Sequence, residues 1–252
     1  MEVDVLADSS PTALRGYEMK GRFTQALEVI TLVVLTVAEL AVVRGEWRDS
    51  ATAGRVQAIR PDAPLPTQPV HPRQDGPRLG TGPVAALLFS EFQCPFCDVF
   101  RRDVMPVLER EYIDQNTLTL YFAHFPLESI HPYAVLAAEV AECASLRGDF
   151  WPIHGRLFDL QRSLTDSAIR SLATDVGLAG PTLDACRSTA AERVRADVEL
   201  GKSLGVRATP SLLLGIARPD GTIDLRQRLS GARPVEEYRR AIEALAPSTV
   251  RQ

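Results

Sequence analysis

The four residues Cys94-Pro95-Phe96-Cys97 constrain the fold of this chain more than any other part of its sequence. The apolar run before them, residues 84–89, predicts a buried strand. Apolar residues at helical spacing follow them and predict an amphipathic helix. If Cys94 caps this helix and Pro95 is its first residue, Cys97 lies one turn further on the same face. A Cys-x-x-Cys at a strand-to-helix junction is typical of a thiol–disulfide redox centre.

The position of the two sulfurs at a helix N-terminus favours the reactive thiolate form of Cys94. Unpaired N–H groups and the positive end of the helix dipole favour the thiolate of Cys94, and cysteines in such motifs have pKa values of about 3.5–7.5. The thiolate attacks a partner thiol or disulfide, and Cys97 resolves the mixed disulfide. The alternatives are half of a zinc site and a structural disulfide. A zinc site needs two further ligands, and the sequence has no second Cys-x-x-Cys and no His-x-x-His, so we expect no metal and no cofactor.

The N-terminal part of the chain contains a segment that suits a membrane. Residues 26–43 form an apolar run with Glu28 and Glu39 near its ends, where a charge costs least. This pattern predicts a membrane anchor, or an uncleaved signal, after an N-terminal tail at residues 1–25. A cleaved signal peptide and a soluble amphipathic helix are the alternatives. Residues 44–80, with six prolines between Pro61 and Pro77, predict an extended linker.

Residues 81–248 have the pattern of an α/β domain. Strands are expected at 84–92, 117–123, 211–216 and 222–229, and helices at 95–112, with a kink at Met105-Pro106, and at 235–245. A helical insertion occupies about 129–204. The net charge is −4, and no basic block or Gly-rich phosphate loop is present, so we expect no nucleic-acid partner.

Two further cysteines, Cys143 and Cys186, lie in predicted helices. A disulfide between them would close a loop of about 43 residues and would stabilise the fold by about 4 kcal/mol in the chain-entropy model. Because such bonds persist outside the cytosol, this pairing and an extracytoplasmic location support each other. The alternative is two buried free thiols that pack as small apolar groups.

The order of these elements resembles that of the DsbA-like thioredoxin-fold family of bacterial disulfide oxidoreductases. The likeness runs over residues 78–246 and is carried by the stretches PRLGTGPVAALLFSEFQCPFC, FAHFPLESIHPYAVLAAEVAECASLRGDFWPIHGRLFDL and LGVRATPSLLL. It implies that Pro210 has a cis peptide bond and that its loop lies against the two sulfurs and keeps metals away. It also implies that the Thr209 backbone pairs with an extended substrate chain as an added strand.

Two positions depart from the family pattern. Strongly oxidising members have a His between the cysteines, where this chain has Phe96, so we expect a less oxidising couple. Relatives often have a buried acid six residues before the first cysteine, where this chain has Leu88. Glu91 is a nearer carboxylate that could carry the proton of Cys97, and the alternative is a solvated or salt-bridged side chain at the strand end. Three histidines match family positions without ligand spacing and are expected to be structural: His124, His131 and His154.

These features predict a membrane-anchored thiol–disulfide oxidoreductase with its catalytic domain on the periplasmic or cell-surface side. Cys94 and Cys97 would donate or exchange disulfides in folding proteins. Its expected partners are thiol- or disulfide-containing proteins, a membrane redox partner and, through residues 26–43, the membrane. A disulfide reductase or isomerase is an alternative of the same class. An accessory subunit of a membrane complex, built on a thioredoxin fold, is an alternative of a different class.

Overall fold

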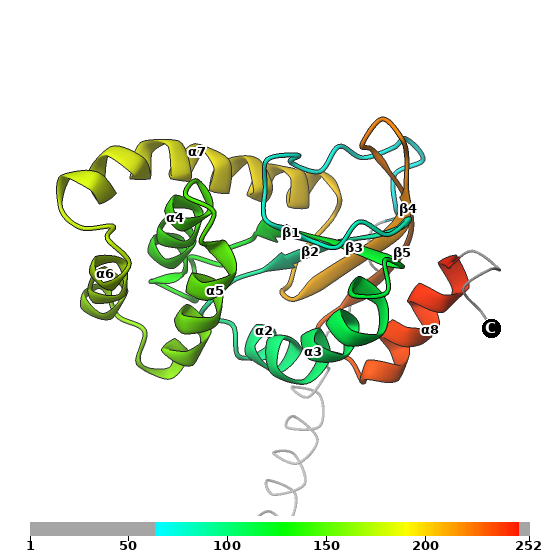
Figure 1. The fold of residues 1–252 in the computed structure, drawn as a ribbon, viewed down its shortest axis with the longest axis horizontal. Coiled ribbons are helices and arrows are strands. Elements are labelled where there is room, and N and C mark those ends of the chain that lie inside the picture. The colour runs from blue at the N-terminus through cyan, green and yellow to red at the C-terminus, as the bar shows by residue number, and fades with distance from the viewer. Residues whose placement is uncertain (1–63, 247–252) are drawn as a thin grey trace, which may run out of the picture. The chain divides into compact units, whose positions relative to one another are not determined.

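A five-stranded sheet forms the centre of the computed structural model, which describes residues 64–246 (Figure 1). Its strands are β1 (Arg78–Leu79), β2 (Val84–Ser90), β3 (Leu118–His124), β4 (Ser211–Ala217) and β5 (Ile223–Ser230). They lie in the order β1–β3–β2–β4–β5. Strands β2 and β3 are parallel, whereas β1–β3, β2–β4 and β4–β5 are antiparallel pairs. Every residue of the central strand β2 is buried, as its apolar sequence predicts.

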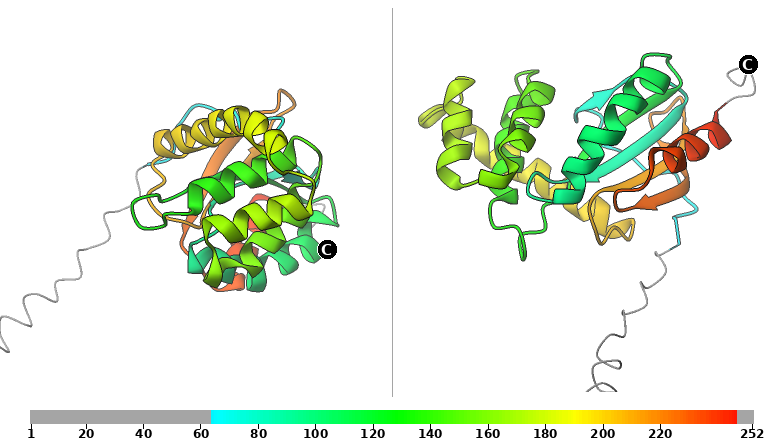
Figure 2. Two further views of the ribbon diagram at one scale, coloured as in Figure 1. Left: turned by 90° about the vertical axis from the view of Figure 1, so that its left-hand side faces the viewer. Right: turned by 90° about the horizontal axis from the view of Figure 1, so that it is seen from below.

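A continuous helical stretch follows β2 and covers one face of the sheet together with α8 (Val235–Leu245) (Figure 2). It consists of α2 (Pro95–Val99), the π-helical turn η1 (Phe100–Val104), α3 (Met105–Leu108) and a second π-helical turn, η2 (Glu109–Ile113). The sequence predicts one helix over 95–112 with a kink at Met105-Pro106. The structure instead has the two π-helical turns on either side of α3. Pro106 lacks the N–H that a regular helix would use at this position.

The helical insertion lies between β3 and β4 in the sequence. It consists of α4 (Ala134–Ser145), α5 (Phe150–Asp159), the 3₁₀ turn η3 (Gln161–Ser163), α6 (Asp166–Asp175) and α7 (Pro181–Ser203). In Figure 1, α4, α5 and α6 gather beside the sheet, and the long α7 returns from them towards it. The predicted α/β fold with an inserted helical subdomain is therefore confirmed.

Alternate residues of β2 supply two layers of apolar core. Val84, Ala86 and Leu88 belong to the layer that α2, α3 and α8 cover. The intervening residues belong to a second layer, which the C-terminal end of α7 covers. A Cβ atom at Gly201 of α7 would lie 2.6 Å from the ring of Phe125, so glycine allows the helix to approach this closely.

The structure differs from the sequence prediction at residues 64–80, which were expected to belong to the linker. Val70 exchanges backbone hydrogen bonds of 2.9 and 2.8 Å with Ile223 and is buried in the second core layer. Nearby, β1 pairs with the edge of β3. The prolines exclude a helix here, but they leave the chain free to pair in an extended form at a sheet edge. The folded domain therefore begins before residue 81.

The predicted tail at residues 1–25, the anchor at 26–43 and the first part of the linker lie outside the described residues. Within 64–246, no helix combines the length and the apolar character needed to cross a bilayer.

Candidate redox site

The two cysteines of the Cys-x-x-Cys motif stand at the N-terminus of α2. Cys94 is the residue before the helix and has an extended backbone with φ −72° and ψ 117°, and Pro95 is in the first turn. The backbone N–H of Cys97 donates to the Cys94 carbonyl at 3.0 Å. Both residues are free thiols, 4% and 1% exposed. The helix begins where the sequence predicts.

The loop that precedes β4 lies against Cys94. The Cys94 thiol donates to the Thr209 carbonyl oxygen at 3.3 Å, and the Thr209–Pro210 peptide bond is cis. The Pro210 carbonyl accepts a hydrogen bond of 2.7 Å from the N–H of Gly231, just after β5. Residues far apart in the sequence thus meet at one sulfur, as the family resemblance implies.

The two thiols have pKa values shifted in opposite directions. A hydrogen bond from the Cys97 thiol lowers the pKa of Cys94 to about 6, against the effect of burial and with help from the backbone N–H groups of Cys97 and Phe96. Burial, and then the hydrogen bond and charge of Cys94, raise the pKa of Cys97. At neutral pH the arrangement therefore supplies a Cys94 thiolate as nucleophile and a protonated Cys97.

Glu91 directly follows β2 and has a fully buried side chain. The N–H of Gln93 donates to its Oε2 at 2.7 Å, and Nδ1 of His131 lies against its Oε1. Burial raises the pKa of Glu91 to about 7, with a further contribution from the charge of Cys94. The alternative that Glu91 is a solvated side chain at the strand end is therefore wrong, whereas the alternative that it is salt-bridged agrees with its contact to His131. The carboxyl group is instead a buried neighbour of the redox motif that can change protonation near neutral pH.

Sequence reasoning missed two residues at this site. His131, expected to be structural, is in contact with Glu91. The Gln161 side chain donates to the carbonyl oxygens of Phe92 at 3.1 Å and Cys94 at 2.9 Å, which fixes the approach to α2. Gln161 lies 67 residues after Cys94 in the sequence, so no local pattern could have identified it.

Two exposed apolar side chains occur close in sequence to residues of this site. Phe96, between the two cysteines, is 60% exposed, and Ile130, next to His131, is 67% exposed. The Thr209 hydroxyl is buried beside Cys94, and its interaction with the sulfur also lowers the pKa of that thiol. Over residues 64–246, His, Cys, Asp and Glu side chains form no group of three or more that could hold a metal ion.

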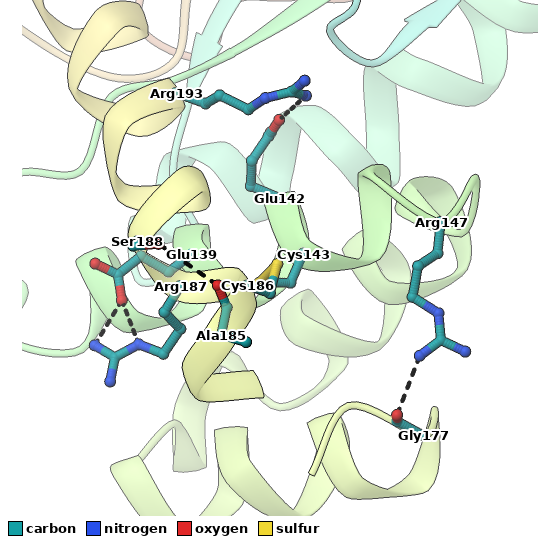
Figure 3. The surroundings of a disulfide bond; sticks show 10 residues. All are labelled: Glu139, Glu142, Cys143, Arg147, Gly177, Ala185, Cys186, Arg187, Ser188 and Arg193. Carbon is teal, nitrogen blue, oxygen red and sulfur yellow. Dashed lines mark hydrogen bonds and ion pairs between the residues drawn. A yellow bond between two sulfur atoms is a disulfide. The ribbon is translucent and has the colours of Figure 1, made fainter. Parts of the chain in front are cut away.

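The other two cysteines lie away from this motif, in the helical insertion. Cys143 of α4 and Cys186 of α7 form a disulfide with a Cα–Cα distance of 5.8 Å (Figure 3). Beside it, an ion pair between Glu139 of α4 and Arg187 of α7 joins the same two helices, with 2.6 Å between the oxygen and the nearer nitrogen. A disulfide and an ion pair therefore both join α4 to α7 within the insertion.

A buried ionic cluster joins the insertion to the segment before β1. Arg73 donates to Glu142 of α4 at 2.7 and 3.0 Å and to Asp197 of α7 at 3.2 Å with each of two nitrogens. His124 of β3 and Arg193 of α7 also contact Glu142, at 3.3 and 3.1 Å. Although burial opposes the charged form, His124 and Arg73 bring the pKa of Glu142 down to about 2. The pairing compensates charges that would be costly if buried alone.

Comparison with known proteins agrees with this geometry. A model of the thioredoxin family matches residues 81–243. The solved structure of alpha-DsbA1 from Wolbachia pipientis superposes with a TM-score of 0.60 at 20% identity, over 69% of this chain and 92% of that one. A probable disulfide bond formation protein D from Bacillus anthracis is 28% identical over 149 residues, which are 55% of this chain and 69% of the relative.

A third relative is of a different kind. The Na(+)/H(+) antiporter NhaA 3 of Salinispora tropica is 30% identical over 206 residues, which cover 80% of this chain and 29% of the antiporter. This chain therefore spans less than a third of that protein's length. The matched length also exceeds the stretch 81–243, so the likeness extends beyond the part that the family model matches.

Proposed function

The chain belongs to the thioredoxin family, and we propose that it is a thiol–disulfide oxidoreductase that transfers disulfides to extracytoplasmic proteins through Cys94 and Cys97. The observation that carries this proposal is the pairing of a Cys94 thiol of lowered pKa with a Cys97 thiol of raised pKa at one helix N-terminus. The names of the disulfide bond formation and DsbA relatives support the same reaction class.

In the proposed reaction, a substrate thiolate attacks the Cys94 sulfur of the oxidised Cys94–Cys97 pair. The internal S–S bond breaks, Cys97 leaves as a thiolate and takes up a proton, and Cys94 is joined to the substrate. A second substrate thiolate then attacks the substrate sulfur of this mixed disulfide, and Cys94 leaves as a thiolate. The substrate is oxidised by two electrons, and the enzyme holds them as two reduced cysteines.

The direction of transfer follows from the stability of the reduced pair. A disulfide oxidant is strong when its reduced form is stabilised, and the lowered pKa of Cys94 is a stabilisation of that kind. Phe96 adds no hydrogen bond to the thiolate, so we place the potential below that of the strongest oxidants of this fold. Reoxidation would fall to a membrane redox partner, with residues 26–43 as the tether.

The substrate site is proposed from the groups around Cys94. The Thr209 backbone would pair with an extended substrate chain as an added strand. The exposed side chains of Phe96 and Ile130 would contact apolar residues of an unfolded protein. The disulfide between Cys143 and Cys186 supports an extracytoplasmic location, because such bonds persist in oxidising compartments.

The reduction potential of the purified full-length protein tests the proposal. Equilibration with glutathione should give a value between about −120 mV, which is typical of a strong oxidant, and about −200 mV. A value near about −270 mV would assign the protein to the reductases. In the same preparation, the oxidised protein should restore activity to a reduced, denatured ribonuclease faster than oxidised glutathione does.

A second function, as an accessory domain of a membrane transporter, is favoured by the likeness to the antiporter. In that case the thioredoxin-like domain would act beside a membrane protein, and its cysteines would be dispensable. Cys94→Ala separates the two functions: cells that depend on the chain should lose disulfide formation under the first and keep full function under the second.

A further inference from the structure

Glu91 lies between the buried thiols and a partly exposed histidine. Its backbone interacts with the sulfur of Cys97, the charge of Cys94 acts on its carboxyl group, and its Oε1 lies against Nδ1 of His131. The Glu91 side chain has no exposed surface, whereas that of His131 is 18% exposed. The Glu91 carboxyl group therefore lies near the redox pair and also touches a histidine that reaches the surface of the protein.

We propose that His131 is the solvent end of a proton relay that serves Cys97 through Glu91. The inference rests on the proposed thiol–disulfide exchange and assigns a new role within that reaction. Because His131 contacts neither sulfur, it is a positioning residue, and Glu91 is the group that exchanges the proton of Cys97.

The need for a relay follows from burial. Cys97 is 1% exposed, so water has little access to its proton. Glu91 is buried as well and cannot exchange a proton with solvent by itself. Its other polar contact, the N–H of Gln93, cannot accept a proton. The imidazole of His131 has two ring nitrogens that can carry protons, and part of its side chain reaches solvent.

The proton balance can be written for both directions of exchange. When Cys97 resolves a mixed disulfide, its sulfur bonds to Cys94 and the partner leaves as a thiolate with the electron pair. The Cys97 proton passes to the Glu91 carboxylate, directly or through one water, then to neutral His131, and then to bulk water. When the internal disulfide is opened instead, Cys97 leaves as a thiolate and a proton travels inwards along the same series.

The other groups around Glu91 do not offer a second path of this kind. The ionisable side chains that act on it are His131 from the loop before α4 and Cys94, the residue before α2. The loop before β4 presents the carbonyl and hydroxyl of Thr209 to the site, and neither ionises in this range. Ser90, the preceding residue, interacts with Cys97 and is likewise not ionisable there.

The experiment separates the two thiols in time. Reduced full-length protein reacts with an aromatic disulfide whose released thiolate is coloured, so that the first release reports attack by Cys94 and the second reports resolution by Cys97. We compare His131→Gln and Glu91→Gln with His71→Gln, a matched control because His71 is an exposed histidine. The two rate constants are measured between about pH 5 and pH 8, a range that spans the ordinary pKa of histidine.

We expect His131→Gln to slow the second release about tenfold at neutral pH and to leave the first unchanged. This is less than the roughly 10²–10⁴-fold of a direct general acid or base, because His131 acts through Glu91. Glu91→Gln should slow the second release at least as much, and His71→Gln should alter neither release. Added imidazole should restore the second release in His131→Gln, because a small base can replace the missing side chain.

Two results would overturn the relay. One is a second release in His131→Gln with the same rate and pH profile as in His71→Gln. The other is an equal slowing of both releases that imidazole does not restore, which would indicate a structural role alone. A wild-type protein that completes both releases but passes no disulfide to a reduced protein would contradict the proposed function and not the relay.

Discussion

The first cysteine of each pair, Cys94 and Cys143, is almost fully buried, yet the groups that surround the two sulfurs differ. Cys94 is 4% exposed and Cys143 is 0% exposed. Backbone N–H groups at the start of α2 point at Cys94, and the Thr209 carbonyl contacts it. Cys143 is bonded to Cys186 between two packed helices. The two pairs therefore differ in the polar groups that surround them and not in the exposure of these two sulfurs, and on this ground we expect Cys94 to be the reactive thiol.

We expect the largest effect on disulfide transfer, with little effect on stability, when Cys94 is replaced. Cys94→Ser removes the thiolate, and a serine hydroxyl does not ionise in its place, so we expect disulfide transfer to fall to the uncatalysed rate. The free energy of unfolding should change by less than about 1 kcal/mol, because the hydroxyl can still donate to the Thr209 carbonyl. Transfer to a reduced model protein and denaturant unfolding measure the two quantities. Residual catalysis by Cys94→Ser would place the nucleophile elsewhere.

Removal of the second pair should have the converse effect. Cys143→Ala combined with Cys186→Ala opens a closed loop with a sequence separation of 43, and the chain-entropy model predicts a loss of about 4 kcal/mol in the free energy of unfolding. Disulfide transfer by the folded protein should remain at the wild-type rate. Unfolding in urea and a transfer assay well below the unfolding midpoint provide the measurements. A loss of transfer in folded protein would mean that the insertion disulfide takes part in the reaction.

Local patterns account for the parts of this fold and site that the sequence predicted. The buried strand β2, the helix that starts at Pro95 and the insertion are all visible as runs or periodicities along the chain. The ionic cluster is not, because Arg73 meets Glu142 and Asp197 across 69 and 124 residues. Charged residues at such separations carry no pattern that marks them as partners. Gln161 could not be identified for the same reason, because its side chain in η3 contacts the Cys94 carbonyl across 67 residues of sequence.

The ionic cluster around Glu142 should make the free energy of unfolding depend on pH. The pKa of Glu142 is about 2 in the folded protein against an ordinary 4.5, so its contribution is fully present above pH 4.5 and is lost as the pH falls towards 2. The shift corresponds to about 3 kcal/mol of stability. We expect the free energy of unfolding to fall by about this amount over that range, and Glu142→Gln to lack this part of the fall. Identical pH profiles for the two proteins would exclude Glu142 as the source.

The smallest change we expect concerns Phe96 and affects the reduction potential of the Cys94–Cys97 pair. Phe96→His would place an imidazolium next to the Cys94 thiolate, and a hydrogen bond to a charged group contributes about 1.5–3 kcal/mol. Because that energy stabilises the reduced pair alone, the reduction potential should rise by about 30–60 mV. Phe96→Leu is the matched control, since it keeps an apolar side chain at a position that is 60% exposed. In the oxidised protein, neither variant should alter the free energy of unfolding by more than about 0.5 kcal/mol. Equal potentials for the two variants, measured against glutathione, would show that the residue between the cysteines does not set the potential in this chain. The lowered pKa of Cys94 would then depend on the Cys97 thiol and the backbone of α2 alone.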